Sequence, residues 1–190
     1  MLFNPYSAEE RERPPLWDTL SERDFPKAHA MIVAGARLDD IIEEDGDTFL
    51  HRAAQENDKV MVDFYIEHEC PKTLETFDYI AQTPLIRASA HGHTDVVVRL
   101  LSARSNPNAR DEGRIGNTAL REAVRGGHIE IVSLLLRAGG DPTIPGWMAI
   151  TAVDQAHYEI EGGLESTKAV GIQQMLARFP SVLRDRKRKV

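Results

Sequence analysis

The sequence predicts an all-α solenoid, a stack of helix-turn-helix units, and two observations carry this prediction. Three similar segments, 48–54, 83–89 and 118–124, each begin with a threonine, and successive threonines lie 35 residues apart. Each segment is followed by a short polar or glycine-containing break and then by an apolar stripe at helical spacing. Self-similarity at a period of about 20–50 residues is typical of repeat proteins, in which each unit buries its apolar face against its neighbours.

The third copy shows the pattern most clearly. Thr118 is placed to cap a first helix whose apolar residues share one face, and the glycine pair 126–127 ends that helix. A second helix is expected to start at His128 and to carry a strongly apolar stripe as far as Leu136. The glycine pair 139–140 supplies a C-terminal stop.

The other two copies repeat this arrangement with changes. In the second copy, residues 85–89 line a short first helix, residues 91–93 break it, and residues 96–101 line the second helix. In the first copy the second helix is expected over 60–66. The segment 106–109 is rich in turn-forming residues and predicts an extended exit from the second copy.

Less regular helix pairs are expected at the two ends. At the N-terminal end they cover 15–20 and 25–33. At the C-terminal end a degenerate first helix is expected over 146–153 and its partner over 166–179, with residues 159–163 as an insertion that breaks the period. Terminal units are expected to be irregular because they have only one neighbour to pack against.

These motifs resemble the ankyrin repeat, a unit of about 33 residues with a T-P-L-H-x-A motif and two antiparallel helices. The matching elements are two complementary parts of that motif, two glycine-histidine turns and two double leucines, at 83–85, 48–51, 92–93, 127–128, 100–101 and 135–136. The resemblance implies short β-hairpin fingers between the helix pairs. It covers one domain, 14–179, between an N-terminal extension, 1–13, and a basic C-terminal tail, 180–190. Its five repeats are expected at 14–42, 43–77, 78–112, 113–144 and 145–179.

The chain also departs from the family pattern. The histidine of the motif is replaced by Ile86 and Arg121 in the middle repeats, and the first full repeat has asparagine and aspartate at 57–58 in place of glycine and histidine. The exits between repeats differ in length, so the fingers should differ in length as well.

The charge of the chain is unevenly distributed. The net charge is −7, but residues 184–189 carry five basic side chains and one acidic side chain, so the rest of the chain carries −11. An acidic body repels phosphate, which argues against nucleic acid as the main partner and favours a partner with a basic surface. Simple solubility is the alternative explanation of the acidic charge.

Several features bear on the location of the protein. The single cysteine, Cys70, excludes an internal disulfide, which suits a reducing compartment. The N-terminus lacks the pattern of a signal peptide, and no run approaches the roughly 18 apolar residues of a membrane helix. We therefore expect a cytoplasmic monomer that does not bind membranes, or a nuclear one if the source is a eukaryote. The basic tail is either a solvated terminus or a nuclear import signal.

No motif in the sequence predicts catalysis, a metal or a cofactor. His91 and His93 flank a glycine, as zinc ligands can, but His93 is explained as a turn histidine and no cysteine or carboxylate cluster is close in sequence. Cys70 follows His68 by two residues, but the two lie in an exit between repeats without an orienting third group. We therefore expect no enzymatic activity, no bound metal and no cofactor.

The resemblance implies that a protein partner meets a concave face, formed by the finger tips and the exposed side of each first helix. Core positions are committed to packing, so binding residues must occupy the free positions of the repeat pattern. The residues expected to contact the partner are Glu44, Asp45, Asp47, Gln55, Glu56, Tyr79, Gln82, His91, Glu112, Asn117, Arg125 and Trp147.

Two features of this set stand out, an acidic first finger and the aromatic residues Tyr79 and Trp147. Aromatic side chains at positions where the pattern needs no large apolar group commonly anchor interfaces. The alternatives are that Trp147 covers the end of the stack, that Tyr79 packs on the loop 72–76, and that the acidic residues form a solvated face. Charge reversal at Asp45 and Asp47 is expected to weaken binding without lowering stability.

These observations favour a non-catalytic protein-interaction module that inhibits its partner by occlusion. A sharper version is an inhibitor that neutralises a toxin or an enzyme, as an immunity protein does, and it rests on analogy with small stand-alone members of the family. The alternative is an adaptor that links two proteins or recruits a substrate, using the concave face together with the basic tail or the segment 157–165.

Overall fold

Helices dominate the part of the chain that the computed structural model describes, residues 15–38, 46–68, 71–114, 116–161 and 167–178. The elements are α1 (Pro15–Ser21), α2 (Phe25–Val33), α3 (Phe49–Glu56), α4 (Lys59–Glu67), α5 (Pro71–Leu74), α6 (Pro84–His91), α7 (Thr94–Ser102), α8 (Ala119–Arg125), α9 (Ile129–Arg137), the 3-10 helix η2 (Trp147–Ala149), α10 (Ala152–Glu161) and α11 (Thr167–Ala177). These ranges contain no β-strand, so the all-α repeat fold is confirmed and the expected β-hairpin fingers are not.

The contacts of the chain divide it into two units, residues 1–41 and 42–190. The first unit contains α1 and α2, close to the helices expected at 15–20 and 25–33. Leu16, Leu20 and Ala28 are fully buried in it. The Thr19 hydroxyl donates to the carbonyl oxygen of Pro15 at 3.1 Å. The Asp24 carboxylate caps α2 by accepting from the backbone N–H of Lys27 at 3.1 Å.

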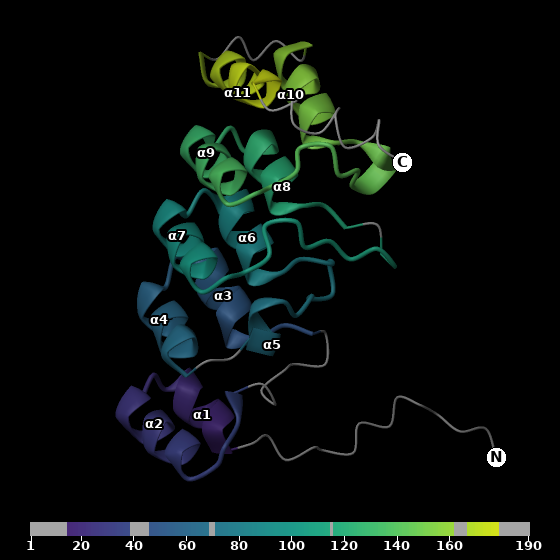
Figure 1. The fold of residues 1–190 in the computed structure, drawn as a ribbon. Coiled ribbons are helices and arrows are strands. Elements are labelled where there is room, and N and C mark those ends of the chain that lie inside the picture. The colour runs from purple at the N-terminus through teal and green to yellow at the C-terminus, as the bar shows by residue number, and fades with distance from the viewer. Residues whose placement is uncertain (1–14, 39–45, 69–70, 115, 162–166, 179–190) are drawn as a thin grey trace, which may run out of the picture. The chain divides into compact units, whose positions relative to one another are not determined.

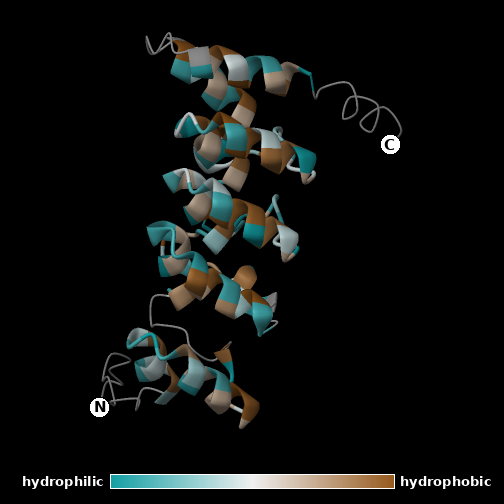
Figure 2. Ribbon diagram, turned by 90° about the vertical axis from the view of Figure 1, so that its left-hand side faces the viewer, coloured by the Kyte–Doolittle hydropathy of each residue, from teal (hydrophilic) through white to brown (hydrophobic). Residues whose placement is uncertain are grey.

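In the second unit the helices form two rows. The first helices α3, α6, α8 and α10 pack on one another in order, and the second helices α4, α7, α9 and α11 form the other row. Figure 1 shows the segments that connect one pair to the next projecting from the side of the first helices. Hydrophobic and hydrophilic residues alternate along each helix (Figure 2), and the largest fully buried side chains include Leu50, Tyr65, Leu85, Leu100, Leu120 and Leu135.

The repeated threonines cap the first helices, as the sequence predicts. The hydroxyl oxygens of Thr48, Thr83 and Thr118 each accept a hydrogen bond from the backbone N–H three residues later, at 3.3, 3.4 and 3.3 Å. All three threonines are buried. The shared part of the motif therefore stabilises the start of each first helix, because each cap satisfies a backbone donor that the helix leaves free.

The turn histidines join neighbouring repeats. The Nε2 atom of His93 lies 2.8 Å from the carbonyl oxygen of Gln55, and that of His128 lies 3.2 Å from the carbonyl oxygen of Ala90. Each ring must donate to its carbonyl, which belongs to the last turn of the preceding first helix. Gly92 is required beside His128, because its φ is +78° and an added Cβ would lie 2.6 Å from the His128 ring.

The C-terminal repeat differs from expectation. The first helix was expected over 146–153, but α10 begins at Ala152 and includes residues 159–161 of the expected insertion. Met148 and Ala149 have positive φ angles of 58° and 59°, which excludes a continuous helix through them. The new start is set by a capping arrangement in which Asp154 accepts from the Thr151 N–H at 2.9 Å, while Thr151 Oγ1 accepts from the Asp154 N–H at 3.1 Å.

The packing of α9 predicts that two adjacent leucines contribute differently to the stability of the protein. Leu135 is fully buried and Leu134 is only partly buried. We expect Leu135→Ala to lower the free energy of unfolding by about 2–5 kcal/mol, because it removes core contacts and leaves a cavity. Leu134→Ala is the matched control and should cost clearly less. Urea unfolding of the two variants measures the difference, and equal losses would contradict the packing of α9.

Candidate functional site

The segments that precede the first helices carry most of the expected binding residues. We call residues 43–47 finger 1, residues 77–82 finger 2, residues 111–117 finger 3 and residues 145–150 finger 4. Glu44 and Asp45 of finger 1 lie outside the described residues. The other ten expected residues are described, and they separate into side chains that build the fingers and side chains that are free on the surface.

Finger 2 is shaped by the buried carboxylate of Asp78. Its Oδ1 atom accepts from the backbone N–H of Ile80 at 2.9 Å and from that of Gln82 at 2.8 Å. Its Oδ2 atom accepts from Nε of Arg87 at 2.7 Å, and Asp78 is completely buried. The side chain of one residue thus closes the loop on itself and ties it to α6. The role of Asp78 is thus to fix the backbone of the finger.

Arg87 extends this network toward the preceding repeat. Its side chain is 5% exposed, lies 3.2 Å from the Asp47 carboxylate and donates to Oε1 of Gln55 at 3.1 Å. Two expected binding residues, Asp47 and Gln55, are therefore tied to a buried guanidinium. A basic residue in place of Asp47 would lie beside the Arg87 guanidinium and repel it. The expectation that charge reversal at this position leaves the stability unchanged therefore does not fit the ion pair.

His51 joins the same network from α3. Its Nε2 lies 3.0 Å from the carbonyl oxygen of Thr76 and 3.1 Å from that of Gln82, while its Nδ1 lies 2.9 Å from the Thr48 hydroxyl. Nε2 must therefore donate, and Nδ1 accepts from the hydroxyl. Burial lowers the pKa of His51, and the Arg87 charge lowers it further, against opposing effects of Asp78, Asp47 and the Gln82 carbonyl.

Asn117 links fingers 3 and 4. Its Oδ1 accepts from the backbone N–H of Trp147 at 3.0 Å and also from the Arg121 guanidinium. Its Nδ2 donates to Oε1 of Glu122 at 2.6 Å. Asn117 is thus a supporting residue more than a free contact. Arg114 of finger 3 reaches back and donates to the carbonyl oxygen of Asp78 at 2.8 Å, which joins fingers 2 and 3.

The two expected aromatic residues are free on the surface. Tyr79 is 59% exposed and Trp147 is 58% exposed. Packing of Tyr79 on the loop 72–76 would bury it, so that alternative is not favoured. Beside them, Ile80 and Met148 are exposed apolar residues that the sequence reasoning missed. The signal was available, since each lies next to an aromatic residue in a finger where the repeat pattern asks for no apolar side chain.

The remaining expected residues lie along the first helices and on finger 3. Glu56, His91, Glu112 and Arg125 are exposed, and Arg125 pairs with Glu122 at 2.5 Å. Burial lowers the pKa of His91, and His93, Arg87 and His128 add to the effect. Gln82 is half-buried, and its backbone N–H donates to Asp78. Its side-chain amide has no hydrogen-bond partner among the described residues.

The fingers enclose a small hollow of about 190 Å³. Its described walls come from three fingers and are Ile80, Ala81, Gln82, Arg114, Gly116, Asn117 and Trp147. The hollow thus brings together the expected residues Gln82, Asn117 and Trp147.

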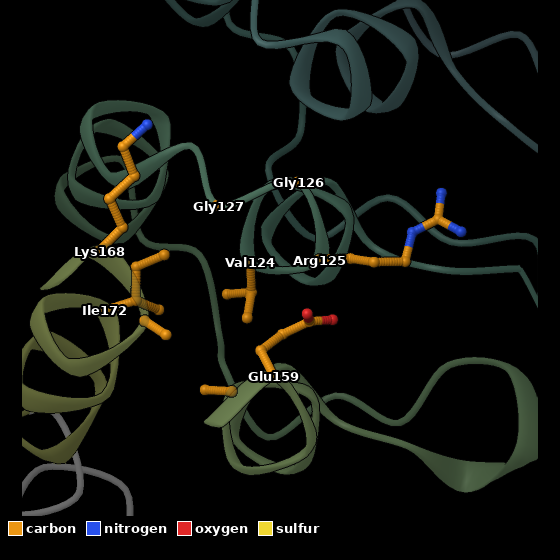
Figure 3. A pocket seen from close by; sticks show the side chains of 9 residues that line it. Val124, Arg125, Gly126, Gly127, Glu159, Lys168 and Ile172 are labelled. Atoms are coloured by element: carbon orange, nitrogen blue, oxygen red, sulfur yellow. The ribbon is translucent and has the colours of Figure 1, made fainter. Parts of the chain in front are cut away.

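A larger hollow of about 350 Å³ lies between α8, α10 and α11. Figure 3 shows the short apolar side chains of Val124 and Ile172 facing the space, with the ends of Arg125 and Lys168 extending outward. The Glu159 carboxylate points toward Val124 and accepts from Nε2 of Gln155 at 2.7 Å. Among the described lining residues Glu159 carries the one carboxylate and Lys168 the one amine, and none is a serine, threonine, cysteine or histidine.

The described residues contain no group of three or more histidine, cysteine, aspartate or glutamate side chains placed to hold a metal ion. His91 and His93 have their ring centroids 6.0 Å apart, with the rings stacked. The Nδ1 atom of His68 lies 2.8 Å from the Phe64 carbonyl oxygen, and Cys70 lies outside the described residues.

No helix in the described ranges has both the length and the apolar character needed to cross a membrane.

Comparison with known proteins points to one family. The model of ankyrin repeats in three copies matches residues 21–111 and 50–146. The chain is 44% identical over 63 residues to the liver isoform of mitochondrial glutaminase from Rattus norvegicus, which covers 33% of the chain and 10% of that protein. It is 40% identical over 57 residues to an ankyrin repeat-containing protein of Schizosaccharomyces pombe, covering 30% and 27%.

A third relative is a putative E3 ubiquitin-protein ligase of Arabidopsis thaliana, 37% identical over 87 residues, which covers 45% of the chain and 23% of the ligase. The chain therefore spans at most about a quarter of the length of each of these relatives.

The network around Arg87 predicts a large effect on stability. We expect Arg87→Met to lower the free energy of unfolding by about 3–5 kcal/mol, because it leaves the buried Asp78 carboxylate without its counter-charge. Arg99→Met is the matched control, since Arg99 pairs with Asp63 where both side chains are partly exposed, and it should cost about 0–1 kcal/mol. Urea unfolding measures both variants, and a loss for Arg87→Met no larger than the control's would contradict a structural role for the network.

The lowered pKa values of His51 and His91 predict a pH dependence of stability. Between the folded pKa and the ordinary value of 6.5, the unfolded chain binds more protons than the folded protein. The contribution of these two histidines to the free energy of unfolding is therefore fully present above about pH 6.5, and it is lost as the pH falls through the folded pKa. We expect a lower free energy of unfolding at about pH 5.5 than at about pH 7.5.

His91→Gln should reduce this pH dependence, because it removes one of the two histidines whose pKa is lowered, and does so at an exposed position. His157→Gln changes an exposed histidine on α10 and is the matched control. Urea titrations at the two pH values measure the slope, and an unchanged slope in His91→Gln would show that the contacts of His91 do not disfavour its protonation.

Proposed function

Because the chain belongs to the ankyrin repeat family, whose repeats are generally protein–protein interaction modules, we propose that it binds one protein partner through its fingers and first helices and inhibits that partner by occlusion. The observation that supports this most is the pair of exposed aromatic side chains, Tyr79 and Trp147, on fingers whose backbones are held by buried or bridging polar groups. Rigid aromatic residues lose little conformational freedom on binding and are enriched among interface residues that contribute most to affinity.

The surface around these aromatic residues supports a protein partner more than a small ligand. Small-molecule sites usually enclose about 300–1,000 Å³ and bury most of the ligand. The hollow between the fingers is smaller, at about 190 Å³, and the exposed residues extend well beyond it to His91 and Arg125 on the first helices. A broad, shallow surface with a few aromatic anchors is what a protein interface requires.

A second candidate function is an adaptor that recruits a substrate or links two proteins. Its support is the partial coverage of the relatives, in which the matched repeats are a minor part of a longer protein, such as one named a putative E3 ubiquitin-protein ligase.

Removal of residues 184–190 separates the two proposals. Unchanged binding of a single partner favours occlusion, and loss of a second partner favours the adaptor. A basic character of the partner stays a prediction from the acidic composition.

The aromatic anchors give the direct test of this proposal. We expect Tyr79→Ala with Trp147→Ala to weaken binding of the partner co-purified from the native host by at least about tenfold, because truncation of aromatic anchors removes their contact area. Tyr158→Ala is the matched control, since Tyr158 is 57% exposed on α10. Affinities are measured by titration calorimetry, together with urea midpoints that should not change. Binding unaffected by the double variant, or equally affected by the control, would contradict the proposed interface.

A further inference from the structure

We infer that the hollow between α8, α10 and α11 binds a lysine side chain of a protein partner. The aliphatic part of the lysine lies against the apolar walls of the hollow, and its ammonium group binds the carboxylate of Glu159. None of the described residues that line this hollow belongs to a finger. The inference therefore goes beyond the proposed function and adds a site outside the fingers.

The hollow is present because small residues meet where α8, α10 and α11 come together. Its described lining residues include the glycines Gly126 and Gly127 and the alanines Ala156 and Ala169. An added Cβ at Gly126 would lie 2.3 Å from Nε2 of His128, so the turn histidine requires a glycine at the end of α8. Because these residues are short, a space of about 350 Å³ stays open between the three helices.

Apolar groups form most of the wall of the hollow. Val124 comes from α8, Ala156 from α10, and Ala169 and Ile172 from α11. Figure 3 shows the side chains of Val124 and Ile172 facing the space. The methylene groups of a lysine pack along such a surface while its charged end reaches a polar group. This contact removes apolar surface from water, which is the main favourable term in association.

The charges at the hollow favour a cation inside it. The Glu159 carboxylate points toward Val124, and the ends of Arg125 and Lys168 extend outward (Figure 3). Arg125 is paired with Glu122, with 2.5 Å between Nη2 and Oε2, so its charge is balanced. Lys168 is exposed, and water screens its repulsion more than it screens a contact with the half-buried Glu159. An ammonium group in the hollow is therefore attracted by Glu159 more than it is repelled.

The hydrogen bonding of Glu159 favours lysine over arginine. Its Oε1 accepts from Nε2 of Gln155 at 2.7 Å, whereas its Oε2 has no hydrogen-bond partner among the described residues. One free oxygen suits an ammonium group, which is a compact charge, while a guanidinium binds best when both carboxylate oxygens accept. Gln155 is 9% exposed and holds Glu159 in place, which reduces the cost of ordering this side chain on binding.

Two observations support a protein as the source of the lysine. Ankyrin repeats are generally protein–protein interaction modules. The chain outside its basic tail is acidic, which attracts a partner with a basic surface. The exposed side chains of Arg125 and Lys168 lie at the edge of the hollow, so a side chain from a neighbouring surface can enter between the helices.

The probes for this inference are blocked tripeptides of the form glycine-X-glycine, in which X is lysine, arginine or norleucine. Binding to the full-length protein is followed by the methyl NMR signals of Val124 and Ile172. We expect the lysine peptide to shift these signals. The other two should bind at least about threefold more weakly, because a guanidinium does not match a single free oxygen and norleucine has no charge.

Variants test the role of the carboxylate. Glu159→Gln keeps an oxygen that can accept from Gln155 but removes the charge, so it should weaken binding of the lysine peptide at least about fivefold. Glu67→Gln is the matched control, since Glu67 is an exposed glutamate on α4 that does not line the hollow. Lys168→Glu should strengthen binding at least about twofold, which a loss of folding would not do. Urea midpoints of all variants check that folding is intact.

The inference is overturned if the methyl signals do not respond to the lysine peptide, or if the arginine or norleucine peptide binds as tightly. Unchanged binding in Glu159→Gln, or no gain in Lys168→Glu, would overturn it as well. The Tyr79 and Trp147 double variant should bind the lysine peptide like the unaltered protein. Failure of this inference therefore leaves the proposed function standing, because that function is tested by the affinity of the double variant for the co-purified partner.

Discussion

The buried ion pair between Arg87 and Asp78 joins a first helix to the finger that precedes it, and the shape of the proposed binding face depends on it. Two charges removed from water are costly unless each is paired and fully hydrogen-bonded. Here Asp78 accepts from Arg87 and two finger N–H groups, and Arg87 also contacts Asp47 and Gln55. This compensation turns a polar loop into a fixed platform, from which Tyr79 and Ile80 project with about half of their surface exposed.

The repeats share a framework and differ in the residues that control the fingers. The threonine caps and the turn histidines recur, and the bonds that they share from repeat to repeat are made to backbone groups. The position three residues after Thr48, Thr83 and Thr118 holds histidine, isoleucine and arginine, and the next position holds arginine, arginine and glutamate. The fingers are therefore supported by different networks, one built on Arg87 with Asp47 of finger 1 and Asp78 of finger 2, and one built on Asn117 between fingers 3 and 4.

The repeat period, the helix pairs and most helix ends could be predicted from the sequence, because they follow from local spacing of apolar residues, threonine caps and glycine stops. The roles of Asp47, Asp78 and Asn117 could not, since all three are polar residues at finger positions and only the fold brings Arg87, Glu122 and Trp147 to them. The start of α10 was missed for a different reason. Thr151 and Asp154 form a readable capping pair, but the tryptophan and methionine before them suggested a helix that positive φ angles exclude.

If this network preforms the fingers, the backbone N–H groups of Ile80 and Gln82 should be protected even though they lie in a surface loop. Hydrogen exchange of these two amides, followed by NMR in the free protein, measures this directly. We predict exchange that is slowed at least about a hundredfold relative to an unstructured peptide. In Arg87→Met this protection should be lost, without urea and at a pH where the rest of the protein stays folded. Exchange at the unstructured rate in the unaltered protein would contradict a preformed finger, and with it the basis of the proposed interface.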